Sequence, residues 1–150
     1  PAIGLCLGGQ LIAHALGANV SRNPQQELGW TAVKRSASVS NRYFQPPSEI
    51  QVMQWHSETF EIPKGAVRLA ENQICTNQMY QIGENVLGFQ FHPEITPQVL
   101  KSFIENEEHE KQFSAHFKPQ IEILKKSKKQ QFEAGNMLLN SAIDYVLREK

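Results

Sequence analysis

The sequence predicts an α/β protein in which helices cover a β-sheet, and three features support this prediction. An apolar segment at residues 1–6 leads through glycines into a helical pattern at residues 8–16. Four strand-like segments then lie between Gly29 and His92, and the pattern becomes helical after Pro97. A strand, a sharp turn, a helix, further strands and terminal helices, in this order, are typical of an α/β sandwich.

The individual elements follow from local patterns. PAIGLC is predicted to be a short buried strand, and Gly17 stands where a glycine ends the helix over Gly8–Leu16. The Gly83–Asn85 segment between two strands is typical of a hairpin turn, and the prolines of Asn41–Ser48 indicate a loop. The other predicted strands are Trp30–Arg35, Ile50–His56, Ile74–Ile82 and Val86–Phe91.

Three helices are predicted after Pro97. The longest has one apolar face, made of Phe132, Leu139, Ile143 and Val146. We expect a single domain over residues 1–150, with a core at 1–97 and a helical tail at 98–150. The predicted helices are Pro97–Ile104, Pro119–Lys126 and Gln131–Arg148.

Composition excludes several classes of function. Fifteen Lys and Arg residues balance fifteen Asp and Glu residues, so the chain lacks the basic field expected of a nucleic-acid-binding protein. No apolar run approaches the length of a membrane span. The two cysteines, Cys6 and Cys75, do not form a disulfide framework, which favours a reducing, cytoplasmic location.

Cys6 lies in a motif that suits a nucleophile. Gly4-Leu5-Cys6-Leu7-Gly8 has the G-x-C-x-G form of a nucleophile elbow, in which small residues on either side allow a sharp turn from strand to helix. The helix N-terminus favours the thiolate, and the N–H of Leu7 points to where an oxyanion would form. The motif alone is equally compatible with a buried structural cysteine.

His92 is the best candidate base for such a nucleophile. It ends the segment VLGFQF, and Glu94 lies two residues later, so that both side chains project to one side of an extended chain. Glu94 could bind one ring nitrogen while the other faces Cys6, as in a Cys–His–carboxylate triad. The alternative is a strand-end histidine beside a solvated glutamate.

The other histidines and the second cysteine are not expected to take part in catalysis. His14 is expected to be packed or half-exposed on its helix, and His109 and His116 to be solvated in a polar segment. We find no pair with convincing metal-ligand spacing and predict no metal site. Cys75 is expected to be a packed thiol.

GLCLGGQ and GFQFHPE, in that order, resemble the class I glutamine amidotransferase family. WHSETFEIPKGAVRLA and CTNQMYQI between them are also similar, particularly to stand-alone members like the glutaminase part of GMP synthetase. The resemblance covers residues 1–96 and implies a flavodoxin-like sandwich with a mixed sheet. It also implies a Cys6–His92–Glu94 triad that cleaves glutamine through a γ-glutamyl thioester, with no metal or organic cofactor.

The resemblance further implies residues that hold glutamine. Gln10 matches a glutamine that helps to bind the substrate, and backbone groups near Ser57 and Glu58 match the segment that binds its α-amino and α-carboxylate groups. His56 could simply orient that segment. Family members pass the released ammonia to a synthase domain or subunit, which this chain has no room to contain, so a separate partner or simple hydrolysis is expected.

In this family several strands and helices precede the elbow, including a loop with a second oxyanion donor. We therefore expect either a fragment of a longer protein or a second chain that completes the sheet. Two other functions stay open: a hydrolase of another γ-glutamyl amide, and a catalytically impaired module with a regulatory or scaffold role.

Overall fold

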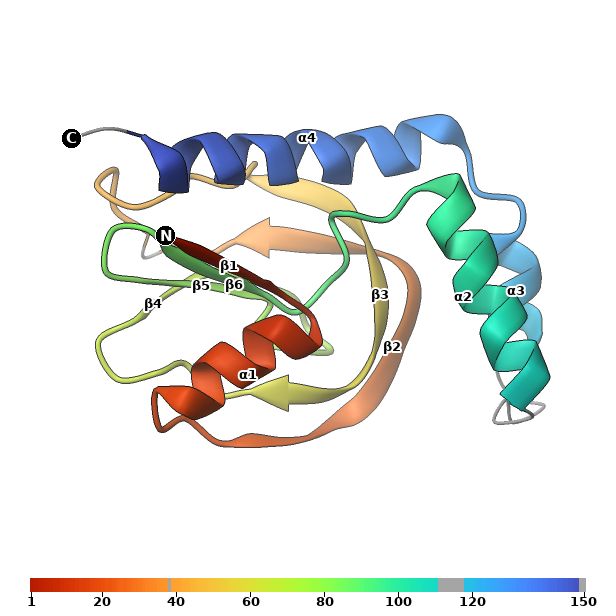
Figure 1. Cartoon of the computed structure of the whole chain (residues 1–150), viewed down its shortest axis with the longest axis horizontal. Coiled ribbons are helices and arrows are strands. Elements are labelled where there is room, and N and C mark those ends of the chain that lie inside the picture. The colour runs from red at the N-terminus through yellow and green to blue at the C-terminus, as the bar shows by residue number, and fades with distance from the viewer. Residues whose placement is uncertain (38, 111–117, 149–150) are drawn as a thin grey trace.

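The computed structural model describes residues 1–37, 39–110 and 118–148, without the side chains of residues 107–110. Figure 1 shows the elements in chain order. They are β1 (Ala2–Leu5), α1 (Leu7–Ala15), β2 (Val20–Arg35), β3 (Glu49–Phe60), β4 (Val67–Glu71), β5 (Met79–Ile82), β6 (Val86–Phe89), α2 (Pro97–Glu110), α3 (Lys118–Leu124) and α4 (Lys129–Leu147).

The strands form a mixed sheet in the order β1-β6-β5-β4-β2-β3. β1 pairs with β6 in parallel, whereas the other neighbouring strands are antiparallel. β2 and β3 make the longest pairing, with a register break between Arg22 and Glu27. Such breaks bend a strand, and Figure 1 shows these two strands curving around one end of the sheet. The mixed α/β architecture expected from the sequence is confirmed.

Helices cover both faces of the sheet. α4 packs Leu138 and Ala142 into the main core with Leu87 and Phe89 of β6. On the other face, Ala13 of α1 packs with residues of β3 and β5. Figure 1 accordingly shows α1 and α4 on opposite sides of β1 and β6. A third cluster joins α2, α3 and the start of α4 to β3, so α2 stands at the end of the sheet where β6 finishes.

Some strand predictions were wrong. The predicted strand Ile74–Ile82 is a strand only from Met79, because the side chain of Asn72 turns the segment before it. Its Oδ1 accepts hydrogen bonds from the backbone N–H of Ile74, at 3.0 Å, and of Cys75, at 2.7 Å. β2 begins ten residues before Trp30, and β4 was not predicted.

The predicted face of the last helix was also partly wrong. Phe132 and Val146 are buried, but Gly135, Leu138 and Ala142 join them in place of Leu139 and Ile143. A Cβ on Gly135 would lie 3.3 Å from the carbonyl oxygen of Pro93. Small residues at the centre of this face therefore let α4 approach the chain that follows β6, and a count of large apolar residues misses them.

Candidate active site

Cys6 occupies a strained turn between β1 and α1. Its φ of 47° and ψ of −107° make it the one non-glycine residue with positive φ in the described part of the chain. Its N–H donates to the carbonyl of Phe89 at 2.9 Å, and its own carbonyl accepts from the N–H of Gln10 at 3.0 Å. Such a conformation costs about 1–3 kcal/mol and persists only where the surroundings enforce it.

Two glycines make this turn possible, and only one of them, Gly4, belongs to the pair that the motif suggested. A Cβ on Gly4 would lie 2.5 Å from the backbone of Gly8, and one on Gly9 would lie 2.6 Å from the carbonyl oxygen of Phe89. A Cβ on Gly8 would meet nothing within 4 Å. The expectation that Gly8 must be small was therefore wrong, and the close approach of α1 to the sheet occurs at Gly9.

His92 and Glu94 are in contact. The Nδ1 of His92 lies 2.7 Å from Oε1 of Glu94, and the backbone N–H of His92 donates to the carbonyl of Met53 at 2.9 Å. From α4, Nδ2 of Asn136 donates to the carbonyls of Pro93 and Ile95, at 2.8 and 3.1 Å. Sequence reasoning missed Asn136, because its role depends on how α4 docks.

The pKa of His92 is raised to about 9. Burial of the ring lowers this pKa, but hydrogen bonds with Cys6 and Glu94 and the negative charges of both groups raise it by more. The ring also makes an edge-to-face contact with Phe103 of α2, with centroids 5.5 Å apart. This environment favours the imidazolium form of His92.

Cys6 and His92 line the same cavity, of about 380 Å³. Leu7 is there too, at the first turn of α1, where N–H groups have no partner within the helix. The other lining residues are Leu5, Trp55, Phe103 and Asn106. A larger cavity, of about 480 Å³, lies between α2, α3 and α4, and neither a cysteine nor a histidine is among the described residues that line it. The candidate nucleophile and base therefore line the smaller cavity.

The predicted glutamine-holding residues lie beside this cavity. Gln10 is buried, and its Nε2 donates to the carbonyl of Glu58 at 3.1 Å and to Oε1 of Gln90 at 3.3 Å. Ser57 is half-buried, and the side chain of Glu58 is exposed. Gln10, Ser57 and Glu58 are thus brought together at the end of β3, but none of the three lines the cavity that holds Cys6.

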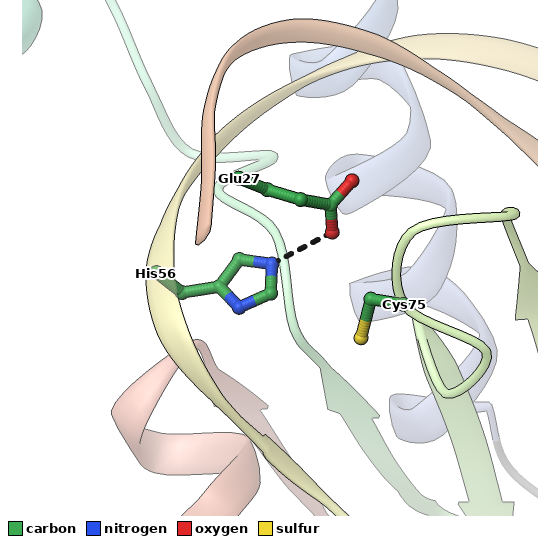
Figure 2. A group of neighbouring side chains, drawn as sticks. All are labelled: Glu27, His56 and Cys75. Atoms are coloured by element: carbon green, nitrogen blue, oxygen red, sulfur yellow. Dashed lines mark hydrogen bonds and ion pairs between the residues drawn. The ribbon is translucent and has the colours of Figure 1, made fainter. Parts of the chain in front are cut away.

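A second polar cluster, which sequence reasoning missed, lies behind that strand end. Figure 2 shows the side chains of Glu27 and His56 directed at each other, with Cys75 beside them. The three are buried, and their possible metal-ligand atoms lie within 4.8 Å of one another. Burial raises the pKa of Cys75; a hydrogen bond with Thr59 opposes this, and the charge of Glu27 adds to it. Cys75 is 1% exposed, so the expected packed thiol is confirmed.

Glutamate, histidine and cysteine are zinc-ligand types, yet protein groups already engage these atoms. His56 Nε2 lies 2.9 Å from Glu27 Oε2, and His56 Nδ1 lies 2.8 Å from the carbonyl oxygen of Glu58. Amide groups of Asn72 and Gln78 also donate to Glu27, at 2.6 and 2.7 Å. A metal ion here would have to break the His56–Glu27 contact, so the geometry fits a hydrogen-bonded network better.

His14 does not line the cavity that holds Cys6. It is exposed on α1, so the expectation of a packed or half-exposed residue was wrong. His116 and the side chain of His109 lie outside the described part of the chain. Among the helices that the structure describes, none combines the length and the apolar character that crossing a membrane requires.

Comparisons with known proteins identify the family of this chain. The family model for glutamine amidotransferase class-I matches residues 1–111. A glutamine amidotransferase-like protein of Salmonella typhimurium, YfeJ, is 34% identical over 112 residues, which are 72% of this chain and 46% of that protein. A GMP synthase [glutamine-hydrolyzing] of Borrelia garinii is 31% identical, over 69% of this chain and 21% of its own.

Gamma-glutamyl peptidase 4 of Arabidopsis thaliana is 33% identical, over 69% of this chain and 43% of its own. This chain therefore spans less than half the length of each of these three relatives. Among solved structures, a glutamine amidotransferase of Thermotoga maritima superimposes with a TM-score of 0.78 and 28% identity, covering 98% of this chain and 62% of that one. The chain belongs to the class I glutamine amidotransferase family.

Proposed function

We propose that the protein hydrolyses the side-chain amide of glutamine, with Cys6 as nucleophile, His92 as acid and base, and Glu94 as the group that orients His92. One observation carries this proposal. Cys6, at the N-terminus of α1, opens onto the same cavity as His92, whose Nδ1 contacts Glu94 at 2.7 Å. A nucleophile, a base and an orienting carboxylate in this order are what covalent catalysis requires.

The reaction has two halves. The Cys6 thiolate attacks the amide carbon of glutamine, and the N–H of Leu7 stabilises the resulting oxyanion. The C–N bond then breaks, and ammonia leaves with a proton from Nε2 of His92. Water next attacks the γ-glutamyl thioester and gives its proton to His92, and the C–S bond breaks to release glutamate. A pKa of about 9 suits His92 to act first as an acid at neutral pH.

The substrate's other end is proposed to lie at the end of β3. Backbone groups near Ser57 and Glu58 would hold the α-amino and α-carboxylate groups. Gln10 would support this segment, because its amide binds the carbonyl of Glu58. Glu58 also leaves its exposed carboxylate available to a cationic group.

The remaining features of the proposal concern the whole protein. Residues 1–150 would act as one unit, because α4 contacts both β3 and the segment after His92.

Ammonia would pass to a synthase partner or be released. A second chain or segment could pair with the free edge of β1, which has one neighbour in the sheet. A reactive thiol favours the reducing cytoplasm.

A second candidate is hydrolysis of another γ-glutamyl amide, which would use the same thioester. The aromatic side chains of Trp55 and Phe103 favour it, because they line the cavity beside Cys6 and could pack against a substituent on the departing nitrogen. A relative named gamma-glutamyl peptidase points the same way.

The test is covalent labelling with a glutamine-like electrophile, read by intact mass, together with ammonia release from glutamine and amine release from γ-glutamyl dipeptides. We expect one adduct, lost in Cys6→Ala, retained in the matched control Cys75→Ala and blocked by excess glutamine. Faster turnover of a dipeptide than of glutamine would favour the second candidate. A Cys6 that labels slowly, regardless of glutamine, together with no turnover of either substrate, would contradict both and favour a catalytically impaired module.

A further inference from the structure

A continuous chain of hydrogen bonds runs from the sulfur of Cys6 to the buried pair of Figure 2. Gln90 is its central link. Gln90 Nε2 lies 3.8 Å from Cys6 Sγ, and Gln90 Oε1 accepts from Gln10 at 3.3 Å. The chain continues through the carbonyl of Glu58 to His56 and ends at Glu27, with contacts of 3.1, 2.8 and 2.9 Å.

The network determines which end of the Gln90 amide faces the sulfur. Gln90 is 0% exposed, so its amide cannot turn toward water. Gln10 presents N–H groups, and only the oxygen of Gln90 can accept them. The NH2 of Gln90 must therefore face Cys6. The backbone N–H of Gln90 also donates to the carbonyl of Gln78 at 2.9 Å, which holds this residue in place beyond the end of β6.

The carbonyl of Glu58 orients the amide of Gln10 in the same way. Its Nε2 donates both to Gln90 and to the carbonyl of Glu58, and that carbonyl also lies against His56. Glu27 binds the far nitrogen of His56 and accepts from two further amides. A buried carboxylate with three donors is a rigid anchor, because releasing any partner leaves a buried polar group unpaired.

An amide N–H directed at sulfur distinguishes the two protonation states of Cys6. A thiol accepts hydrogen bonds weakly, whereas bonds to an ionised acceptor are roughly twice as strong as neutral ones. Burial of Gln90 strengthens this preference, because water does not compete for its amide. The N–H of Gln90 that faces the sulfur therefore binds a thiolate more strongly than a thiol.

We propose that Gln90 is a positioning residue for the Cys6 thiolate, with its amide oriented by Gln10 and anchored through Glu58 to the buried Glu27–His56 pair. Gln90 acts through Cys6 and has no contact with substrate in this scheme. Its place in catalysis rests on the proposed glutaminase function, whereas its effect on the sulfur does not.

The test is the rate at which iodoacetamide alkylates Cys6, followed by intact mass and peptide mapping between pH 5 and 10. Gln90→Met keeps the side-chain volume and removes the donor. We expect alkylation at pH 7 to slow about tenfold and the midpoint of the rate profile to rise by about one pH unit. Gln10→Met, which leaves Gln90 present but frees its oxygen, should give a smaller shift in the same direction.

The matched control is Gln81→Met. Gln81 is also a buried glutamine on the same sheet, but it binds Phe44 and Tyr145, away from Cys6. It should leave the alkylation profile unchanged. With glutamine as substrate, Gln90→Met should lower kcat about tenfold with little change in KM, because the lost contact is to the nucleophile.

An unchanged alkylation profile in folded Gln90→Met protein would overturn the proposal. Should circular dichroism show that this variant is unfolded, Gln10→Met decides, and an unchanged profile there overturns the proposal as well. Slower alkylation in Gln90→Met without glutamine turnover by the unmodified protein would refute the proposed function and support the role of Gln90.

Discussion

Replacing Cys6 by alanine is expected to lower the pKa of His92, because Cys6 is one of the two residues that raise it. The ring is buried, and burial by itself would move this pKa below the ordinary value of 6.5. The hydrogen bonds and charges of Cys6 and Glu94 reverse that effect and bring the pKa to about 9. The two residues can be removed one at a time, which separates their contributions.

The raised pKa of His92 sets how much the ionised ring stabilises the folded protein. A change from 6.5 to about 9 corresponds to roughly 3 kcal/mol at 1.36 kcal/mol for each unit. Because the folded-state pKa is raised, this stabilisation is fully present below pH 6.5, declines between pH 6.5 and about 9, and is absent above that range. The free energy of unfolding should therefore fall by at most about 3 kcal/mol between pH 6 and pH 9.5.

Heteronuclear NMR of the histidine rings, assigned with His92→Asn, measures the pKa of His92 directly. We expect Cys6→Ala and Glu94→Gln each to lower the pKa of His92 by on the order of one to two units. The double variant should bring it below 6.5, because only burial remains. Urea unfolding at pH 6 and pH 9.5 gives the stability difference.

Two outcomes would refute this reasoning. One is a His92 that titrates at or below 6.5 in the unmodified protein, which would mean that Cys6 and Glu94 do not compensate for burial. The other is a Cys6→Ala variant in which His92 titrates as before, which would mean that the sulfur carries no charge toward the ring.

Two further changes test the turn and the buried pair by urea unfolding. Gly4→Ala should destabilise the protein by about 3 kcal/mol or more, because its Cβ would lie 2.5 Å from backbone atoms, whereas Gly8→Ala should change stability by less than about 1 kcal/mol. Equal effects would contradict the assigned packing of the elbow. Glu27→Gln should lower the free energy of unfolding by about 3–5 kcal/mol. The new amide NH2 would face the N–H groups that Glu27 now accepts, those of Asn72 and Gln78, and the buried ring of His56. The control Glu49→Gln removes an exposed ion pair and should cost less than about 1 kcal/mol; a small loss in Glu27→Gln would show that the buried pair is not an anchor.

Elements with strong local signals were predicted well. The helix ending at Gly17, the hairpin turn after Ile82 and the loop around Pro46 follow from glycine and proline, which act on their own backbone. The segment from Ile74 was predicted wrongly, because the side chain of Asn72 turns the backbone and outweighs the strand preference of its neighbours.

In the candidate site, too, local features were predicted and long-range contacts were not. Cys6 in its glycine-flanked motif, and His92 two residues before Glu94, are local patterns that the sequence alone determined. Which glycines must be small depended on tertiary packing, since Gly9 is held against Phe89, eighty positions away, and Gly8 faces open space. Asn136 likewise acquires its role only when α4 docks on the segment after β6.

The sequence by itself determined the chemistry-bearing groups, because a turn, a helix start and a two-residue spacing involve only neighbouring residues. Only the tertiary structure decided that β1 pairs with β6, so that Cys6 and Gln90 meet across 84 positions, and that Glu27 faces His56 across 29. The physical reason is that a buried polar group needs a partner, and the fold decides which residue that partner is. The residues next to a glutamine or glutamate in the sequence do not specify that partner.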